Sequence, residues 1–106
     1  MNTQTERFLI DGPVGKIEVA LDRPGEGAPT RGIALVAHPH PLYGGTMDNK
    51  VAQTLARTLV QLGYITYRSN FRGVGETQGE HDNGTGERDD LLAVVAHMRE
   101  IGRAHV

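Results

Sequence analysis

The stretch from Ile33 to Thr46, which reads IALVAHPHPLYGGT, decides the fold of this chain. Its first five residues, Ile33 to Ala37, are apolar at every position. That pattern is typical of an interior strand of a parallel sheet that helices cover on both faces. The remaining residues carry two prolines and two adjacent glycines, so they can neither continue the strand nor begin a helix. The stretch therefore predicts a buried strand that leads into a stiff connection.

A helix and a second strand are predicted to follow this connection. Asp48 is a suitable N-cap, and apolar residues then recur at helical spacing. The residues expected to face the sheet are Val51, Leu55, Leu59 and Leu62. Gly63 suits the position just after a helix, and Tyr64 to Tyr67 has the composition of a strand. Strand, helix and strand in this order form a right-handed crossover between two parallel strands.

Further elements are predicted on either side of this unit. Residues 7–22 predict a β-hairpin, because turn residues precede an alternating apolar pattern, and residues 23–32 read as an exposed loop. The glycine-rich segment 69–86 is expected to be a long functional loop. A second amphipathic helix is predicted from Glu87 to about Arg99. Its buried side is expected to comprise Leu91, Val95 and Met98, flanked by Leu92 and Ala96.

The composition excludes several classes of protein. The chain has 106 residues, 38% of them hydrophobic, and a net charge of −2, which suits one globular domain at most. Its 11 Lys and Arg residues against 13 Asp and Glu offer no basic surface to nucleic acid. The absence of cysteine excludes a disulfide scaffold, a thiolate metal site and a cysteine nucleophile. No transmembrane run and no secretory signal are visible, so a cytoplasmic protein without a membrane partner is expected.

The predicted order of elements indicates an incomplete domain. A hairpin followed by strand, helix, strand and helix leaves an apolar sheet edge unpaired, so residues 1–100 are interpreted as the front half of a larger α/β domain. Residues 101–106 (IGRAHV) can be back-translated as ATC GGA AGA GCA CAC GTC, which looks like a sequencing-adapter read translated in frame. They are interpreted as not native. The alternative, an ordinary helix end capped by Gly102, stays open.

The connection from His38 to Thr46 is the first candidate for chemistry. It follows the carboxyl end of a strand, where open α/β sheets bind their ligands. Backbone N–H groups in such a turn can stabilise an oxyanion as it develops in a transition state. Proline has no N–H, so the donors would come from His40, Leu42, Tyr43 or the two glycines. The alternative is a rigid connection without chemistry.

A metal site is the second candidate. His38 and His40 belong to this connection, whereas His81 and Asp82 belong to the long loop at the same end of the predicted sheet. Imidazole and carboxylate groups are ligands of zinc and iron. A metal-dependent hydrolase that uses these four side chains is therefore one alternative. It requires loops to hold at least three ligands.

The remaining polar residues show weaker patterns. The glycines of residues 73–79 are out of register for dinucleotide binding. Ser69 is the single serine, and its large neighbours do not suit a nucleophile elbow, so it is interpreted as the polar end of a strand. His97 is expected to be a partly exposed helix side chain. Asp89 and Asp90 are expected to complement the helix dipole from the first turn.

Three segments resemble the α/β-hydrolase superfamily, and in particular small bacterial hydrolases whose third strand ends in an H-P-H-P loop. IALVAHPHPLYGGTMDNKV (33–51) resembles that strand, the oxyanion loop and the start of the first helix. YITYRSNFRGVGETQG (64–79) resembles the fourth strand and the D-x-R-G-x-G-x-S segment, with Asn70 and Thr77 where Asp and Ser are usual. GERDDLLAVVAHM (86–98) is similar to the helix that precedes the nucleophile strand. The two departures leave the side-chain roles of positions 70 and 77 open.

The resemblance implies an α/β fold, the three-layer α/β-hydrolase fold, of which this chain carries the N-terminal portion. It implies a serine hydrolase of carboxylic esters or similar small-molecule acyl substrates, without a cofactor or a nucleic-acid partner. The serine, acid and histidine of such enzymes come later in the chain than residue 106, so this chain would be inactive by itself. It would contribute the oxyanion loop, through the main-chain N–H groups of His40 and Leu42, with Tyr43 next. A complete α/β binding or interaction module without catalysis is a further alternative.

Overall fold

The computed structural model describes residues 5–25, 30–37, 46–80 and 85–104, with the side chains of the last helix up to Glu100. The elements in chain order are β1 (Glu6–Asp11), β2 (Lys16–Asp22), β3 (Gly32–Val36), α1 (Lys50–Gln61), β4 (Tyr64–Ser69) and α2 (Thr85–Ala104). The predicted order of hairpin, strand, helix, strand and helix is confirmed.

The four strands form one mixed sheet in the order β1-β2-β4-β3. β1 and β2 pair antiparallel as the predicted hairpin, and β3 and β4 pair parallel as the crossover requires. β2 also pairs antiparallel with β4, which joins the hairpin to the crossover unit. Among the described residues β3 pairs only with β4, and most of it is half-buried. The expectation of an interior strand is therefore not met in this part of the chain.

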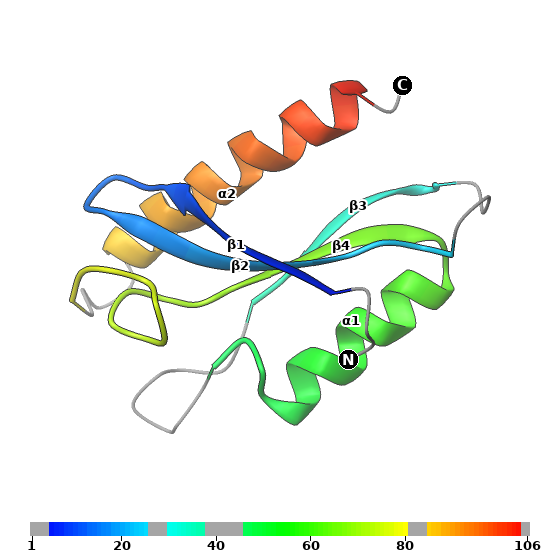
Figure 1. The fold of residues 1–106 in the computed structure, drawn as a ribbon, viewed down its shortest axis with the longest axis horizontal. Coiled ribbons are helices and arrows are strands. Elements are labelled where there is room, and N and C mark those ends of the chain that lie inside the picture. Colours follow the sequence, from blue (N-terminus) through cyan, green and yellow to red (C-terminus); the bar gives the residue numbers. More distant parts are fainter. Residues whose placement is uncertain (1–4, 26–29, 38–45, 81–84, 105–106) are drawn as a thin grey trace.

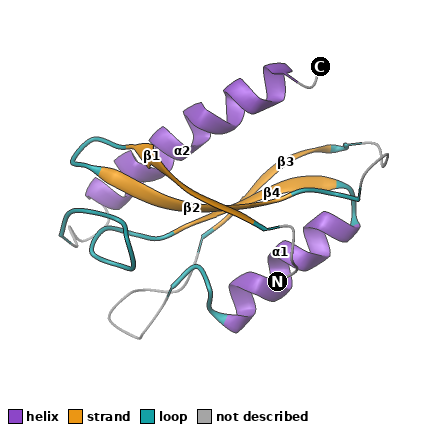
Figure 2. Ribbon diagram, viewed as in Figure 1, coloured by secondary structure: helices purple, strands orange, loops and turns teal. Residues whose placement is uncertain are grey.

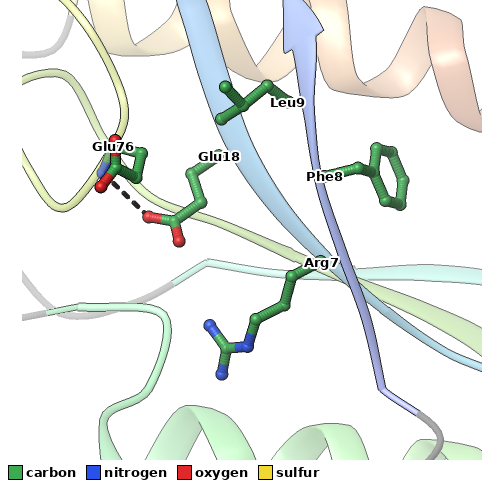
Figure 3. Close-up of a pocket in the computed structure, with 5 residues that line it drawn as sticks. All are labelled: Arg7, Phe8, Leu9, Glu18 and Glu76. Atoms are coloured by element: carbon green, nitrogen blue, oxygen red, sulfur yellow. Dashed lines mark hydrogen bonds between the residues drawn. The ribbon is translucent and has the colours of Figure 1, made fainter.

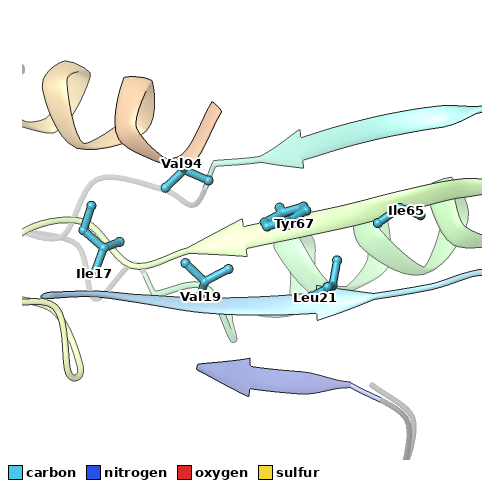
Figure 4. Close-up of a cluster of buried hydrophobic side chains, with 6 residues drawn as sticks. All are labelled: Ile17, Val19, Leu21, Ile65, Tyr67 and Val94. Atoms are coloured by element: carbon cyan, nitrogen blue, oxygen red, sulfur yellow. The ribbon is translucent and has the colours of Figure 1, made fainter. Parts of the chain in front are cut away.

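The two helices cover opposite faces of this sheet, which gives three layers (Figures 1 and 2). The core on the α2 face is apolar and fully buried (Figure 4). It comprises Ile17, Val19, Leu21, Ile65, Tyr67 and Val94. A smaller cluster on the α1 face joins Val36 of β3 to Ala52, Ala56 and Leu59 of the helix. The layered arrangement matches the N-terminal part of the expected fold.

The buried face of α1 differs from the predicted stripe. Ala52 and Ala56 are the buried residues, whereas three of the four predicted residues are half-exposed or more. Those three are Val51, Leu55 and Leu62. Small alanine side chains let the helix backbone approach β4 closely, and this close packing outweighs the count of large apolar residues. The predicted end of the helix is confirmed, because Gly63 follows the C-cap with a φ of 99°.

Helix α2 is longer than predicted, and its buried side differs in part from the predicted one. It begins at Thr85, two residues before Glu87, and continues to Ala104, so Gly102 lies inside the helix and does not cap it. Val94, which was not predicted, is its fully buried core residue, and Met98 packs against the same core as predicted, whereas Leu92 is exposed. Although α2 has 20 residues, neither it nor any other helix in the described ranges is apolar enough over a sufficient length to cross a membrane.

Candidate active site

The parallel strands β3 and β4 end at the same edge of the sheet, with Val36 opposite Arg68. Ligands of open α/β sheets bind outside this carboxyl edge. Two chain segments meet there in the described structure: Thr46 to Asn49, which leads into α1, and residues 70–79, which follow β4. Their contacts define the candidate site.

Asn70 connects these two segments through its side-chain amide. Its Oδ1 accepts a hydrogen bond from the Met47 backbone N–H at 2.8 Å. Its Nδ2 donates to Glu18 Oε1 at 2.7 Å, and its own N–H donates to the Glu18 carbonyl at 3.1 Å. The residue is buried. An amide suits this position because one side requires an acceptor and the other a donor.

Thr77 holds Asn70 through the backbone carbonyl of that residue. Its hydroxyl donates to the Asn70 carbonyl at 2.9 Å and accepts the Glu18 N–H at 2.9 Å. It is also buried. Positions 70 and 77, whose roles the sequence left open, therefore both make specific side-chain bonds, and both bonds connect to Glu18 on β2.

The glycines of residues 73–79 serve a compact turn beside this network. The Val74 N–H donates to the Phe71 carbonyl, and the Thr77 N–H donates to the Val74 carbonyl, each at 3.0 Å. Gly75 has a φ of 55°, which disfavours other residues. A Cβ atom at this position would also come within 2.6 Å of the Asn70 amide nitrogen. The turn therefore needs glycine both for its backbone conformation and for the space beside Asn70.

Arg68, near the end of β4, binds the second backbone polar group of Met47, its carbonyl. Its Nη1 donates to the Met47 carbonyl at 2.8 Å and lies 3.3 Å from Asp48 Oδ1. Its Nη2 lies 3.4 Å from Asp22 Oδ2, and both of these side chains are completely buried. Met47 thus has both backbone polar groups bound by side chains, one from β4 and one from the residue that follows it, while its own side chain is buried.

Asp48 does not cap helix α1, contrary to the prediction. The N-cap is Asn49, whose side chain accepts the N–H groups of Val51 and Ala52. Asp48 instead pairs with Arg7 of β1, at 2.6 Å between Nη2 and Oδ1, and with Arg68. The hydrogen bond from Arg7 is the main reason that the pKa of Asp48 lies below its usual range. Ion pairs therefore connect the segment before α1 to both β1 and β4.

Replacing Asp48 with Asn is expected to destabilise the protein near neutral pH and progressively less in acid. Since the folded-state pKa of Asp48 is lowered, its contribution is complete above the unfolded value of about 3.9 and is lost as the pH falls below it. The loss should be no more than about 1 kcal/mol, because 43% of the side chain is exposed and solvent screens the pair. Urea unfolding of both proteins at several pH values measures the difference. A difference that grows on acidification would contradict this assignment.

Arg72 and Asp90 form a buried ion pair that joins the turn to helix α2. Arg72 Nε and Nη2 donate to the two oxygens of Asp90 at 3.0 and 3.1 Å. Asp90 is buried and lies beyond the first turn, in which Glu87 is the acidic residue. The expectation that Asp89 and Asp90 complement the helix dipole from the first turn is therefore wrong. Gly86 makes room for the Arg72 guanidinium, which a Cβ at that position would overlap.

A surface pocket of about 250 Å³ lies beside this network, over strands β1 and β2 (Figure 3). Its lining residues are Arg7, Phe8, Leu9, Glu18 and Glu76. Glu18 belongs to both features, because its Oε1 also accepts the Glu76 N–H at 2.9 Å. None of the residues around this pocket was a candidate from the sequence. The alternation of β1 and β2 is ordinary, and the charges meet only because the strands pair in this register and the turn bonds to Glu18.

The residues predicted to carry chemistry fall mostly outside the described ranges. His38, His40, Leu42 and Tyr43 lie in residues 38–45, and His81 and Asp82 lie in residues 81–84. Within the described ranges, no group of three or more His, Cys, Asp or Glu side chains could hold a metal ion. The metal alternative and the oxyanion donors thus remain predictions.

Two other predicted roles can be compared with the structure. Ser69 is the last residue of β4 and is 2% exposed, as expected for the polar end of a strand. His97 is half-buried on α2, and its Nδ1 lies 3.1 Å from the Tyr67 hydroxyl. The prediction of a partly exposed helix side chain is confirmed. Its hydrogen bond to the sheet was not predicted.

Known proteins of similar sequence and structure share this architecture. No family model matches the chain. An α/β serine hydrolase homologue from Coxiella burnetii is 51% identical with a TM-score of 0.85, and the match covers 94% of this chain and 47% of that one. XC6422 from Xanthomonas campestris, described as an α/β serine hydrolase without a lid, is 42% identical with a TM-score of 0.86, covering 94% and 46%. Protein RP471 from Rickettsia prowazekii is 46% identical over 94 residues, which are 89% of this chain and 39% of that protein.

The described chain thus has the architecture of the N-terminal part of the α/β-hydrolase fold, and its structural neighbours are α/β serine hydrolase homologues. It spans just under half the length of the two solved structures and about two fifths of the Rickettsia protein.

Proposed function

We propose that this chain, which folds like the N-terminal part of an α/β serine hydrolase, is the oxyanion-loop half of an enzyme that cleaves a carboxylic ester or a similar small-molecule acyl substrate. The observation that carries the proposal is the match to serine hydrolase homologues at 51% and 42% identity over nearly the whole chain. Support also comes from the two segments that meet at the carboxyl edge of β3 and β4, where this fold binds its ligands.

In the proposed reaction, a serine in a later segment attacks the acyl carbonyl while a histidine takes its proton, with an acid orienting that histidine. The carbonyl oxygen becomes an oxyanion. The proposed donors to it are the main-chain N–H groups of His40 and Leu42, with Tyr43 next, together with an N–H beside the serine. No cofactor takes part in the proposed chemistry, and the protein is proposed to act in the cytoplasm.

The described residues support the assignment of the nucleophile to a later segment. Ser69 is the single serine of the chain, and it is buried at the end of β4. A nucleophile of this fold requires an exposed hydroxyl on a sharp turn between a strand and a helix. Residues 101–106 are proposed to be non-native, so residues 1–100 form the half domain.

Ester hydrolysis tests the proposal. The gene is sequenced past the codon for Glu100, and the full-length protein and the 106-residue chain are assayed with short p-nitrophenyl esters. We expect a strand that ends in Gly-x-Ser-x-Gly, turnover by the full-length protein, loss of turnover when that serine is replaced with Ala, and no turnover by the 106-residue chain. An in-frame stop directly after Glu100, or a full-length protein that cleaves no ester, would refute the proposal.

A further inference from the structure

Met47 lies in a connection between two elements, yet side chains bind both of its backbone polar groups. Its N–H donates to Asn70 Oδ1 and its carbonyl accepts from Arg68 Nη1, both at 2.8 Å. Its side chain is fully buried. Met47 lies two residues before Asn49, the N-cap of helix α1, so these bonds set where the helix begins relative to the end of β4.

The direction of the Asn70 amide is set by Glu18. The carboxylate accepts from Asn70 Nδ2 at 2.7 Å, which leaves Oδ1 to face the Met47 N–H. The Glu76 N–H donates to the same Glu18 oxygen. A flipped amide would place its oxygen against the Glu18 carboxylate and its NH₂ against the Met47 N–H, so one orientation is strongly preferred.

We propose that Asn70, oriented by Glu18, is a positioning residue that fixes Met47 and with it the α1 end of the connection carrying the proposed oxyanion donors. This inference rests on the proposed hydrolase function. Asn70 touches no reacting atom in this proposal. It acts through the backbone of Met47, and it requires a donor toward Glu18 together with an acceptor toward Met47.

Replacing Asn70 with Asp tests this requirement, because the shape is kept and the donor is removed. Two carboxyl groups at hydrogen-bond distance cannot both ionise without strong repulsion. At acidic pH they share a proton, and the bond between positions 18 and 70 persists. At higher pH both are charged, and the grip on Met47 is lost. The other charged groups nearby are Arg7 and Glu76 around the pocket and Arg68 on the far side of Met47.

The experiment measures kcat and KM for ester hydrolysis by the full-length protein across pH, with each variant expressed as a ratio to the unmodified enzyme. N70A should lower kcat about tenfold or more at every pH, with KM changed less. N70D should approach the unmodified enzyme at the acidic end and fall about tenfold below it as the pH rises. E80Q, which changes an exposed glutamate outside this network, is the matched control, and its ratio should stay near one at every pH.

The double variant E18Q/N70D exchanges amide and carboxylate between the two positions and restores a donor and an acceptor between them, although the NH₂ group that E18Q introduces can no longer accept the Glu76 N–H. It should therefore recover part of the lost kcat and remove the pH dependence of the N70D ratio. A flat N70D ratio across pH, or a double variant no better than N70D, would overturn the inference. Should N70D fail to fold, the double variant must still fold and cleave the ester with a ratio that does not change with pH, and its failure to do so would also overturn the inference. An inactive unmodified enzyme would instead refute the proposed function.

Discussion

Replacing Arg72 with Met is expected to lower the free energy of unfolding by about 3–5 kcal/mol near neutral pH. The Asp90 carboxylate is 4% exposed, and both of its oxygens are bound by the Arg72 guanidinium. Removing the cation leaves a buried negative charge whose desolvation nothing offsets. Chemical denaturation near neutral pH measures the loss.

Two variants serve as controls for this expectation. Arg88 pairs with Asp89 on the exposed surface of the same helix at 3.8 Å, so Arg88→Met should cost less than about 1 kcal/mol. Replacing Arg72 with Met together with Asp90 with Leu removes both charges and should recover much of the loss. A single Arg72→Met variant within about 1 kcal/mol of the unmodified protein would contradict the role of this pair.

Replacing Arg68 with Met is expected to have an effect of similar size, about 3–5 kcal/mol. The change removes a fully buried guanidinium from Asp22, whose side chain is also fully buried, and from the Met47 carbonyl. Asp22 keeps a hydrogen bond from the Thr5 hydroxyl, but this does not neutralise its charge. Ester turnover by the full-length protein should fall as well, because Met47 loses one of the two groups that hold it.

The double variant Arg68→Met with Asp22→Asn separates charge from packing. The amide that replaces the Asp22 carboxylate carries no charge and can still accept from Thr5, so a substantial part of the lost stability should return. Turnover should remain low, because the bond to Met47 is still missing. Arg57→Met, on the exposed side of α1, is the matched control and should change stability by less than about 0.5 kcal/mol. Equal losses for Arg57→Met and Arg68→Met would contradict the assignment.

The order and type of the elements could be predicted from the sequence because each depends on local pattern. The alternation in residues 16–22 and the apolar run from Ile33 predicted strands that the structure confirms. The antiparallel pairing of β2 with β4 could not be predicted in this way. It depends on which strands meet in space, and the crossover rule constrains only the parallel pair.

The faces of the two helices were predicted less well, for a physical reason. Counting large apolar residues favoured Val51 and Leu55 on α1, whereas the helix approaches the sheet through Ala52 and Ala56. On α2 the buried Asp90 shares the inner face with Val94, because Arg72 neutralises it there. A periodicity of side-chain size cannot anticipate close packing by alanine or a buried ion pair.

The location of the candidate site could be predicted from the sequence, but its hydrogen-bond network could not. The carboxyl edge of β3 and β4 follows from the crossover topology, and the segments on either side of residues 38–45 are found there. The network of Glu18, Arg68, Asn70 and Thr77 was missed, because its partners are up to 59 residues apart in the chain. Only the register of β2 with β4 brings them together.

Covalent labelling with a fluorophosphonate tests the central claim most directly. The full-length protein is treated with the probe, and the modified serine is located by mass spectrometry of its peptides, with heat-denatured protein as the control. We expect a single adduct on a serine encoded downstream of the codon for Glu100, and none on the isolated 106-residue chain. An adduct on Ser69, or a full-length protein that forms no adduct at all, would contradict it.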